Sequence, residues 1–255
     1  MKKIRSQTYS SSILSLKKNE AIILRRHRYQ EEKMVLDIHS KFWSLGYGDF
    51  PENSLYFWSN KKWNEVKGQI LLYLSPFSII KWKIRKGNLK WIYLLSQTNL
   101  EKATQIESKI ISPFQSHFLP LIKSSSSLLA FIEKQHGIHP NLKSESHVEG
   151  LLRKTIQKRF MISENIKSLV KENYNYSYVS RQFKKSYDIS PVKYRNQLRL
   201  IQASHELLFS DESILEIANK IGLTDSKFFY NQFKTILGTN PSKFLIHKKK
   251  FTKPA

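Results

Sequence analysis

The sequence predicts an α+β fold in which a mainly-β N-terminal part is followed by an all-α C-terminal part. Three observations carry this prediction. Apolar and polar residues alternate in several segments of the first 95 residues, apolar residues recur at helical spacing from Leu100 onward, and the last third contains a duplicated pattern. At 255 residues the chain is long enough for two domains.

The N-terminal strands are predicted from alternation with a period of two. Residues 80–85 alternate apolar with basic side chains, Gly87-Asn88 supplies a turn, and the alternation then resumes. This pattern predicts a β-hairpin in which Trp82 and Trp91 pack against each other. A loop is predicted at Gly46, Gly48 and Pro51, and further strands at Ala21–Leu24, Met34–Ile38, Leu55–Trp58 and Gln69–Leu74.

Two helical faces are predicted between these strands and Pro140. The first consists of Ala103, Ile106 and Ile110, and the second of Leu128, Leu129 and Ile132. A serine run at residues 124–127 precedes the second face, and Ser127 is interpreted as its helix cap rather than as part of a flexible linker. The polar stretch after Pro140 places a domain boundary there, with a linker over residues 141–155.

The most informative feature is an internal duplication with a period of 50 residues. Residues 181–184 match residues 231–234, and Ser-Pro at 190–191 matches Asn-Pro at 240–241. Agreement at a single offset indicates two copies of one supersecondary unit. The matched positions are Val179, Phe183, Lys184, Pro191 and Tyr194 with Phe229, Phe233, Lys234, Pro241 and Phe244.

The second copy predicts a helix-turn-helix unit. Ser213 and Glu216 form a capping box at the start of one helix, Gly222 supplies the positive φ that ends it, and Thr224-Asp225 begins the next. The buried side chains are expected to be Ile214, Ile217, Ala218, Ile221, Phe229, Phe233 and Ile236. The outward side chains that could bond base edges or phosphates are Ser226, Lys227, Tyr230, Asn231 and Lys234.

The first copy predicts a similar but less regular unit. Its buried residues are expected to be Ile166, Leu169 and Val170 in one helix and Val179, Phe183 and Tyr187 in the next. Its outward set is Tyr178, Ser180, Arg181, Lys184 and Lys185. A single helix over residues 191–208 is expected to join the two units, at about 163–187 and 213–237, and to hold their outward helices roughly 34 Å apart, which suits adjacent major grooves of DNA.

Composition limits the classes of function. The net charge of +23 favours a polyanionic partner, of which nucleic acid is the common one and an anionic membrane the other candidate. Both halves are basic, so charge alone does not locate the site. The absence of cysteine excludes disulfides, thiolate zinc sites and cysteine nucleophiles. Because neither a signal peptide nor a membrane span is evident, a cytoplasmic protein is expected. His136 and His139 are interpreted as surface histidines with no carboxylate partner nearby, and residues 248–250 as a solvated tail.

The motifs of residues 160–245 resemble the DNA-binding domain of the AraC/XylS family of bacterial regulators. In the second copy the resemblance rests on residues 213–218, 222–225 and 238–241 together with Phe229, Phe233-Lys234 and Phe244. In the first copy it rests on residues 180–184, 189–191 and 198–200 together with Tyr194 and Ala203. Three positions depart from the family pattern. Asn231 stands where arginine is usual, Asp188 stands where glycine is common, and the turn before Val179 is one residue shorter.

The resemblance implies an architecture of about seven helices in residues 156–255, and an N-terminal part, residues 1–140, that is barrel-like with trailing helices and serves effector sensing or dimerisation. The stretch from Leu100 to Ile138 is then a candidate dimer interface, although core packing of its apolar residues is favoured. The implied partners are double-stranded promoter DNA and RNA polymerase, with a small-molecule effector and a homodimer as further candidates. No membrane partner is expected.

The function predicted from the sequence is therefore sequence-specific transcription regulation, as an activator by family habit, and not an enzyme. The alternative is a ligand-independent architectural or nucleoid-type DNA binder. A module joined to an alkylation-repair enzyme would need acceptor cysteines, which the chain lacks. Neither a cofactor nor a metal is expected. The predicted DNA-binding residues are Tyr178, Ser180, Arg181, Lys184, Lys185, Thr224, Ser226, Lys227, Tyr230, Asn231 and Lys234.

Overall fold

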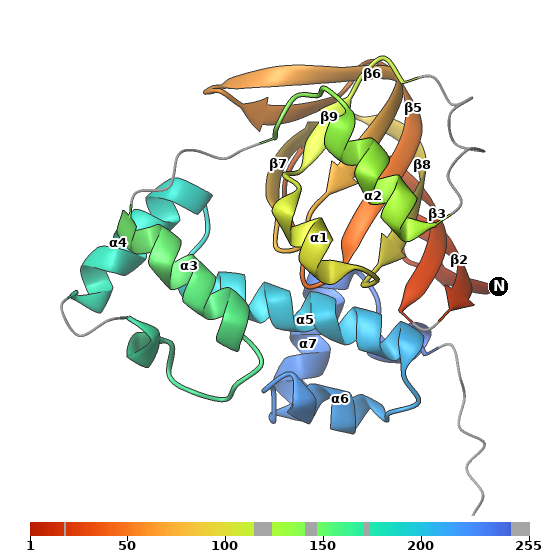
Figure 1. The fold of residues 1–255 in the computed structure, drawn as a ribbon. Helices are drawn as coiled ribbons and strands as arrows, with labels where there is room; N and C mark the ends of the chain where they lie inside the picture. Colours follow the sequence, from red (N-terminus) through yellow and green to blue (C-terminus); the bar gives the residue numbers. More distant parts are fainter. Residues whose placement is uncertain (18, 115–123, 141–146, 171–173, 246–255) are drawn as a thin grey trace, which may run out of the picture.

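The computed structural model describes residues 1–17, 19–114, 124–140, 147–170 and 174–245. Strands dominate its first part and helices its second, so the predicted α+β class is confirmed (Figure 1). The strands are β1 (Lys2–Arg5), β2 (Tyr9–Lys17), β3 (Glu20–Tyr29), β4 (Lys33–Ile38), β5 (Trp43–Ser59), β6 (Lys62–Leu74), β7 (Ile79–Ile84), β8 (Gly87–Ser96) and β9 (Lys109–Ile111). The α-helices are α1 (Leu100–Gln105), α2 (Ser125–Lys134), α3 (His147–Arg159), α4 (Tyr176–Tyr187), α5 (Pro191–Phe209), α6 (Ile214–Lys220) and α7 (Ser226–Leu237), and the 3₁₀ helices are η2 (Ile166–Leu169) and η3 (Pro241–Lys243).

The nine strands form one antiparallel sheet in the order β1-β2-β3-β8-β5-β6-β9, with β7 joining β5 to β4. The long strand β5 organises this sheet. Its first residues pair with β8 and its later residues, Leu55–Phe57, pair with β7, so the sheet folds over at β5. A register shift between Phe50 and Leu55 marks the bend. The β5–β6 turn places Asn60 and Lys61 at positive φ, as a tight hairpin turn requires.

Two N-terminal predictions are wrong. Strands β7 and β8 do not form the predicted hairpin, because β7 pairs with β4 and β5 whereas β8 pairs with β3 and β5. Trp82 and Trp91 nevertheless contact the same apolar cluster. The predicted loop at Gly46, Gly48 and Pro51 lies inside β5. At Gly48 a Cβ atom would lie 2.6 Å from the Phe50 ring, so glycine here permits close packing within a strand rather than a loop.

Helices α1 and α2 cover the face of the sheet that carries Trp43 and Tyr73 (Figure 1). The first predicted helical face is only partly right, because α1 ends at Gln105 and Ile110 belongs to β9. The second face is confirmed, with Leu128, Leu129 and Ile132 buried. The cap of α2 is Ser124, and Ser127 completes its capping box from the third helical position. All six predicted apolar residues of the two faces are buried in the monomer, as core packing requires.

The duplication predicted from the sequence is confirmed in the helical part. Helices α4 and α7 each contain 12 residues and begin at residues 176 and 226, which are 50 apart. Both helices end on a residue in the left-handed conformation, Asp188 and Gly238. Proline then starts the following helix in each copy, at Pro191 in α5 and Pro241 in η3. The predicted helix over residues 191–208 is α5, which extends one residue further to Phe209.

The start of the first unit departs from the prediction. Its first helix is the 3₁₀ helix η2, in which Asn165 caps the amide of Lys167, instead of an α-helix like α6. Val170 ends η2 and is half-buried, and the residues that follow it, 171–173, lie outside the described ranges. The predicted linker over residues 141–155 overlaps α3 from His147 onward, and its first six residues are likewise not described.

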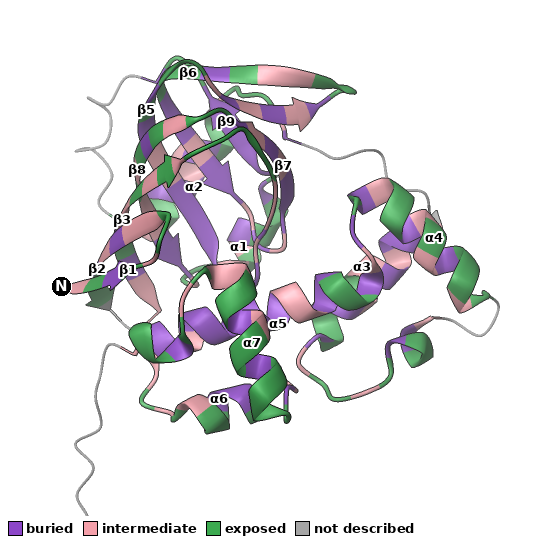
Figure 2. Cartoon of the chain, turned by 180° about the vertical axis from the view of Figure 1, so that it is seen from behind, coloured by how far each residue is buried: buried purple, intermediate pink, exposed green. Residues whose placement is uncertain are grey.

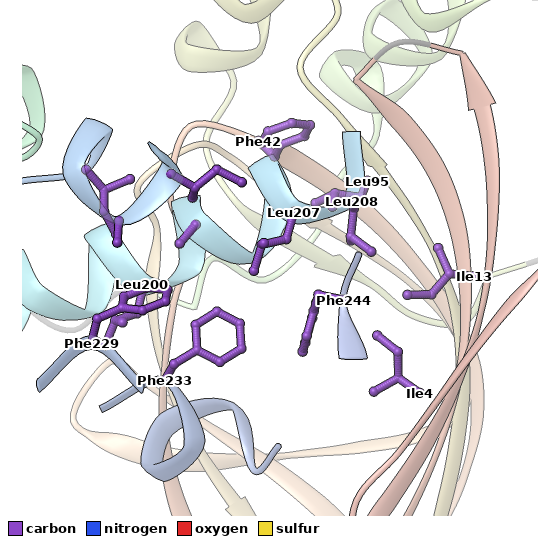
Figure 3. Close-up of a cluster of buried hydrophobic side chains, with 14 of the residues drawn as sticks. Ile4, Ile13, Phe42, Leu95, Leu200, Leu207, Leu208, Phe229, Phe233 and Phe244 are labelled. Atoms are coloured by element: carbon purple, nitrogen blue, oxygen red, sulfur yellow. The ribbon is translucent and has the colours of Figure 1, made fainter. Parts of the chain in front are cut away.

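The N-terminal sheet and the C-terminal helices share a hydrophobic core. Figure 3 shows Ile4, Ile13 and Phe42 from the N-terminal part against Leu207 and Phe244 from the helical part. A second cluster joins residues of β4 and β7 to α3, α4 and the first half of α5. Polar contacts cross the same boundary: the Tyr9 hydroxyl donates to the Leu237 carbonyl, Arg153 Nη2 to the Phe77 carbonyl at 2.9 Å, and Ser40 Oγ to Gln202 Oε1 at 3.1 Å. Both helix-turn-helix units are therefore packed against the sheet.

Candidate nucleic-acid interface

Helices α4 and α7 present the predicted site residues. Figure 2 shows exposed residues along both helices, with α5 between the two units. Ten of the eleven predicted residues are exposed, namely Tyr178, Arg181, Lys184, Lys185, Thr224, Ser226, Lys227, Tyr230, Asn231 and Lys234. Ser180 is half-buried at the edge of its helix face. Thr224 precedes α7, and the other residues lie within the two helices. The structure thus places the predicted residues on two separate outward faces.

The outward face of α7 is fixed by burial of its opposite face. Asp225 caps the helix by accepting a hydrogen bond from the Phe228 amide at 2.9 Å. Phe229 and Phe233 are fully buried against Leu200 of α5 and Ala218 of α6. Because these two phenylalanines are four residues apart, they define one stripe and leave Lys227, Tyr230, Asn231 and Lys234 on the remaining surface.

The outward face of α4 is fixed in the same way. Val179, Phe183 and Tyr187 are buried, and the Phe183 ring lies 5.6 Å from the ring of Tyr194 on α5. Asn175 caps the helix by accepting a hydrogen bond from the Ser177 amide. At the other end, Lys81 on β7 forms an ion pair with Asp188, which ties the end of α4 to the sheet.

Two buried arginine side chains tie α5 to the segment that joins α3 to η2. Arg199 donates to the carbonyls of Phe160 and Ile162, and Arg195 donates to the Glu164 carbonyl at 2.8 Å. Burial and the neighbouring charge of Arg195 lower the pKa of Arg199 to about 10, so it stays a cation at neutral pH. Gly222 packs so close to this arginine that a Cβ would lie 2.8 Å from Nη2. Its φ of +76° supplies the turn predicted from the sequence.

Five of the exposed candidates are cations: Arg181, Lys184, Lys185, Lys227 and Lys234. Within the described part of the chain, none of their side chains forms an ion pair or a hydrogen bond with protein. Lys220 on α6 differs, because its Nζ lies 3.2 Å from Glu206 and 2.9 Å from Glu212. Burial alone would lower the pKa of Lys220, but these two carboxylates raise it. The two outward faces therefore carry positive charge that is available to an external anion.

One exposed side chain on α7 was missed from the sequence. Phe228 is 39% exposed although it is large and apolar, and it lies between the predicted residues Lys227 and Tyr230. A helical face assigned by polarity alone leaves such a residue out. The duplication contained the signal, because Phe228 stands 50 residues after Tyr178, which was included.

The two histidines before Pro140 differ in their surroundings. His136 is exposed, as predicted, but His139 has a carboxylate partner, since its Nδ1 lies 3.3 Å from Glu107 Oε2. Among the residues that the structure describes, no group of three or more histidine, aspartate and glutamate side chains could hold a metal ion. Within the same ranges, no helix has the length and apolar character needed to cross a membrane.

The comparisons with known proteins centre on the C-terminal part. A family model described as a helix-turn-helix domain matches residues 170–246. The Msm operon regulatory protein of Streptococcus mutans is 30% identical over 125 residues, which cover 49% of this chain and 45% of that protein. The transcriptional activator RhaS of Yersinia pestis is 39% identical over 61 residues, covering 24% of this chain and 22% of that protein. The chain thus spans less than half the length of either relative.

A likeness over almost the whole chain comes from solved structures. The structure of ToxT from Vibrio cholerae bound to (E)-4-(8-methylnaphthalen-1-yl)but-3-enoic acid has a TM-score of 0.59 and 11% identity, covering 89% of this chain and 98% of that one. At 11% identity this similarity shows a shared fold and nothing more. The two chains have the same order, a strand-rich part followed by about seven helices.

Proposed function

The C-terminal helices form a helix-turn-helix domain of the AraC/XylS type, and from this premise we propose that the chain is a transcription regulator that binds promoter DNA through α4 and α7. The observation that carries the proposal is the pair of matching outward faces. Each belongs to a 12-residue helix, the two start 50 residues apart, and their cations have no protein partner among the described residues. Unpaired cations and polar side chains on such helices suit phosphates and base edges.

The connecting helix supports binding to two grooves. Helix α5 is a single helix from Pro191 to Phe209, and both units bury apolar side chains against it. A stiff connection of this kind holds the two outward helices at one spacing. We propose that they enter adjacent major-groove segments, which are about 34 Å apart along B-DNA.

The regulator would act on transcription through partners other than DNA. We propose that the bound protein recruits RNA polymerase and acts as an activator. An effector that binds the N-terminal part and a homodimer both stay predictions, because the likeness to ToxT concerns the fold alone.

The test is a selection of bound duplexes from a random pool by the purified full chain. We expect enrichment of two short motifs whose centres lie one helical turn, about 10 base pairs, apart. Transcription by bacterial RNA polymerase from a promoter that carries the selected site should then rise when the protein is added. Binding with steep salt dependence but no enriched sequence would favour the architectural DNA binder instead.

Removing a base-contacting cation should weaken specific binding. We expect Lys227→Ala and Arg181→Ala each to cost about 1–3 kcal/mol on the selected site and to relax sequence preference at one position. Titration of labelled duplexes at fixed salt measures the change. Lys134→Ala removes an exposed charge from α2 and serves as the matched control. Wild-type affinity and preference in both variants would remove these residues from the interface.

Lys234 should behave differently, because it lies towards the end of α7, where a phosphate contact is expected. We expect Lys234→Ala to weaken binding about equally on all sequences and to lower the slope of log K against log salt by about 1. Affinities for the selected duplex and a scrambled duplex at several salt concentrations provide the measurement. Altered base preference in this variant would contradict a phosphate role.

A further inference from the structure

Two aromatic side chains occupy matching places in the two outward helices. Tyr178 is the third residue of α4 and Phe228 the third residue of α7. They are 46% and 39% exposed, whereas the residues that follow them, Val179 and Phe229, are almost completely buried. The duplicated unit therefore exposes a large ring in the first turn of each helix.

Within the described residues, neither ring belongs to a hydrophobic cluster or stacks on another aromatic side chain. Phe228 has no polar atom in its side chain, so it gains little from water and cannot bind a phosphate. Contact with an apolar surface on a partner would bury this ring favourably.

The helix position indicates which apolar surface. In helix-turn-helix proteins, residues near the N-terminus of the second helix contact the base edges in the major groove. The apolar group that a base presents there is the C5-methyl of thymine, and phenylalanine is one of the side chains that contact it. Lys227 and Asn231 flank Phe228 and offer only polar contacts, which are suited to guanine and adenine.

We propose that Phe228 packs against the C5-methyl group of a thymine, and that Tyr178 does the same at the matching position of the other half-site. This inference rests on the proposed function. It makes these two rings specificity-determining residues and predicts a T·A pair at equivalent places in both selected motifs. Phe228 gives the cleaner test, because the Tyr178 hydroxyl can also form hydrogen bonds.

The test replaces each thymine of the selected duplex, one at a time, by deoxyuridine. This change removes one methyl group and leaves base pairing intact. For the wild-type chain we expect one position in each half-site where deoxyuridine weakens binding about fourfold, the effect of burying a single methyl group. Phe228→Ala should bind thymine and deoxyuridine duplexes equally at the position in its half-site and keep the discrimination in the other. Tyr178→Ala should show the reverse.

Leu215→Ala is the matched control, since Leu215 is 57% exposed on α6 and lies outside the proposed interface. It should retain both affinity and discrimination, and a cooperative thermal unfolding transition of Phe228→Ala shows that this variant is folded. Equal binding of all deoxyuridine duplexes by the wild-type chain, or unchanged discrimination in Phe228→Ala, would overturn the inference alone. A selection that enriches no sequence would defeat the proposed function, and this inference with it.

Discussion

Replacement of Phe42 by alanine should destabilise the entire chain by about 3–5 kcal/mol. Phe42 is 2% exposed and precedes β5 in the N-terminal part, yet its ring packs on α5. The ring centroid lies 5.4 Å from that of Phe209 in a stacked arrangement and 4.4 Å from that of His205. Because the same cluster contains Leu207 and Phe233, the cavity opens between the sheet and the second helix-turn-helix unit.

Two spectroscopic signals can follow the two parts separately. All five tryptophans lie between residues 43 and 91, so tryptophan fluorescence reports on the sheet, whereas far-UV circular dichroism at 222 nm reports chiefly on the helices. We expect both denaturation midpoints to fall together in Phe42→Ala. The matched control Ile92→Ala, at a residue 45% exposed on β8, should change stability by less than about 0.5 kcal/mol. A fluorescence midpoint that moves while the dichroism midpoint stays would show that the shared core does not couple the two parts.

The helical part was predictable from sequence because its signals are local. The capping box at Ser213 and Glu216 and the glycine at 222 each act within a few turns of chain, and the 50-residue repeat compares one such local pattern with another. The left-handed conformation of Asp188 follows from its alignment with Gly238. The first helix of the first unit was not predictable in this way. Asn165 caps a 3₁₀ turn there, and its sequence has neither the capping box nor the glycine of the second unit.

The sheet was predictable in its strands but not in its pairing. Alternation marks a strand and its buried face, yet it does not identify the neighbouring strand. Gly87 and Asn88 were interpreted as the turn of a hairpin, but they are the first residues of β8 and pair with β3. The long strand β5 separates β7 from β8 and pairs with both. The glycines of β5 resemble those of a loop in the sequence. Only the close approach of the Phe50 ring explains Gly48.

The candidate site was largely predictable because amphipathic helices reveal which face is buried. Phe229 and Phe233 define the inner side of α7, and the polar residues follow from them. Phe228 escaped because an apolar residue is assigned to the core by default, and only the fold shows that it is exposed. The contacts of the sheet with both units also escaped prediction, since they join residues as distant in sequence as Tyr9 and Leu237.

Mild acid should loosen the boundary between the sheet and α5 through His205. This histidine is buried between Phe42 and the body of α5, and burial, followed by the charge of nearby His39, lowers its pKa from 6.5 to about 3. Below pH 6.5 the unfolded chain takes up a proton at this side chain, whereas the folded chain does not. The contribution of neutral His205 to the free energy of unfolding is therefore fully present above about pH 6.5. It falls by about 1.4 kcal/mol per pH unit as the pH drops toward 3, or about 2 kcal/mol by pH 5.

The measurement is the free energy of unfolding at pH 7.5 and pH 5 for the wild-type chain and for His205→Gln. Other groups also respond to acid, among them half-buried His27, whose pKa burial lowers to about 4. The prediction therefore concerns the difference between the two proteins. His205→Gln should lose about 2 kcal/mol less than the wild-type chain over this interval. His136→Gln, at an exposed histidine, should follow the wild-type chain. If both proteins lost the same free energy of unfolding, His205 would be hydrated in the folded protein. The boundary between the sheet and α5 would then be open to water.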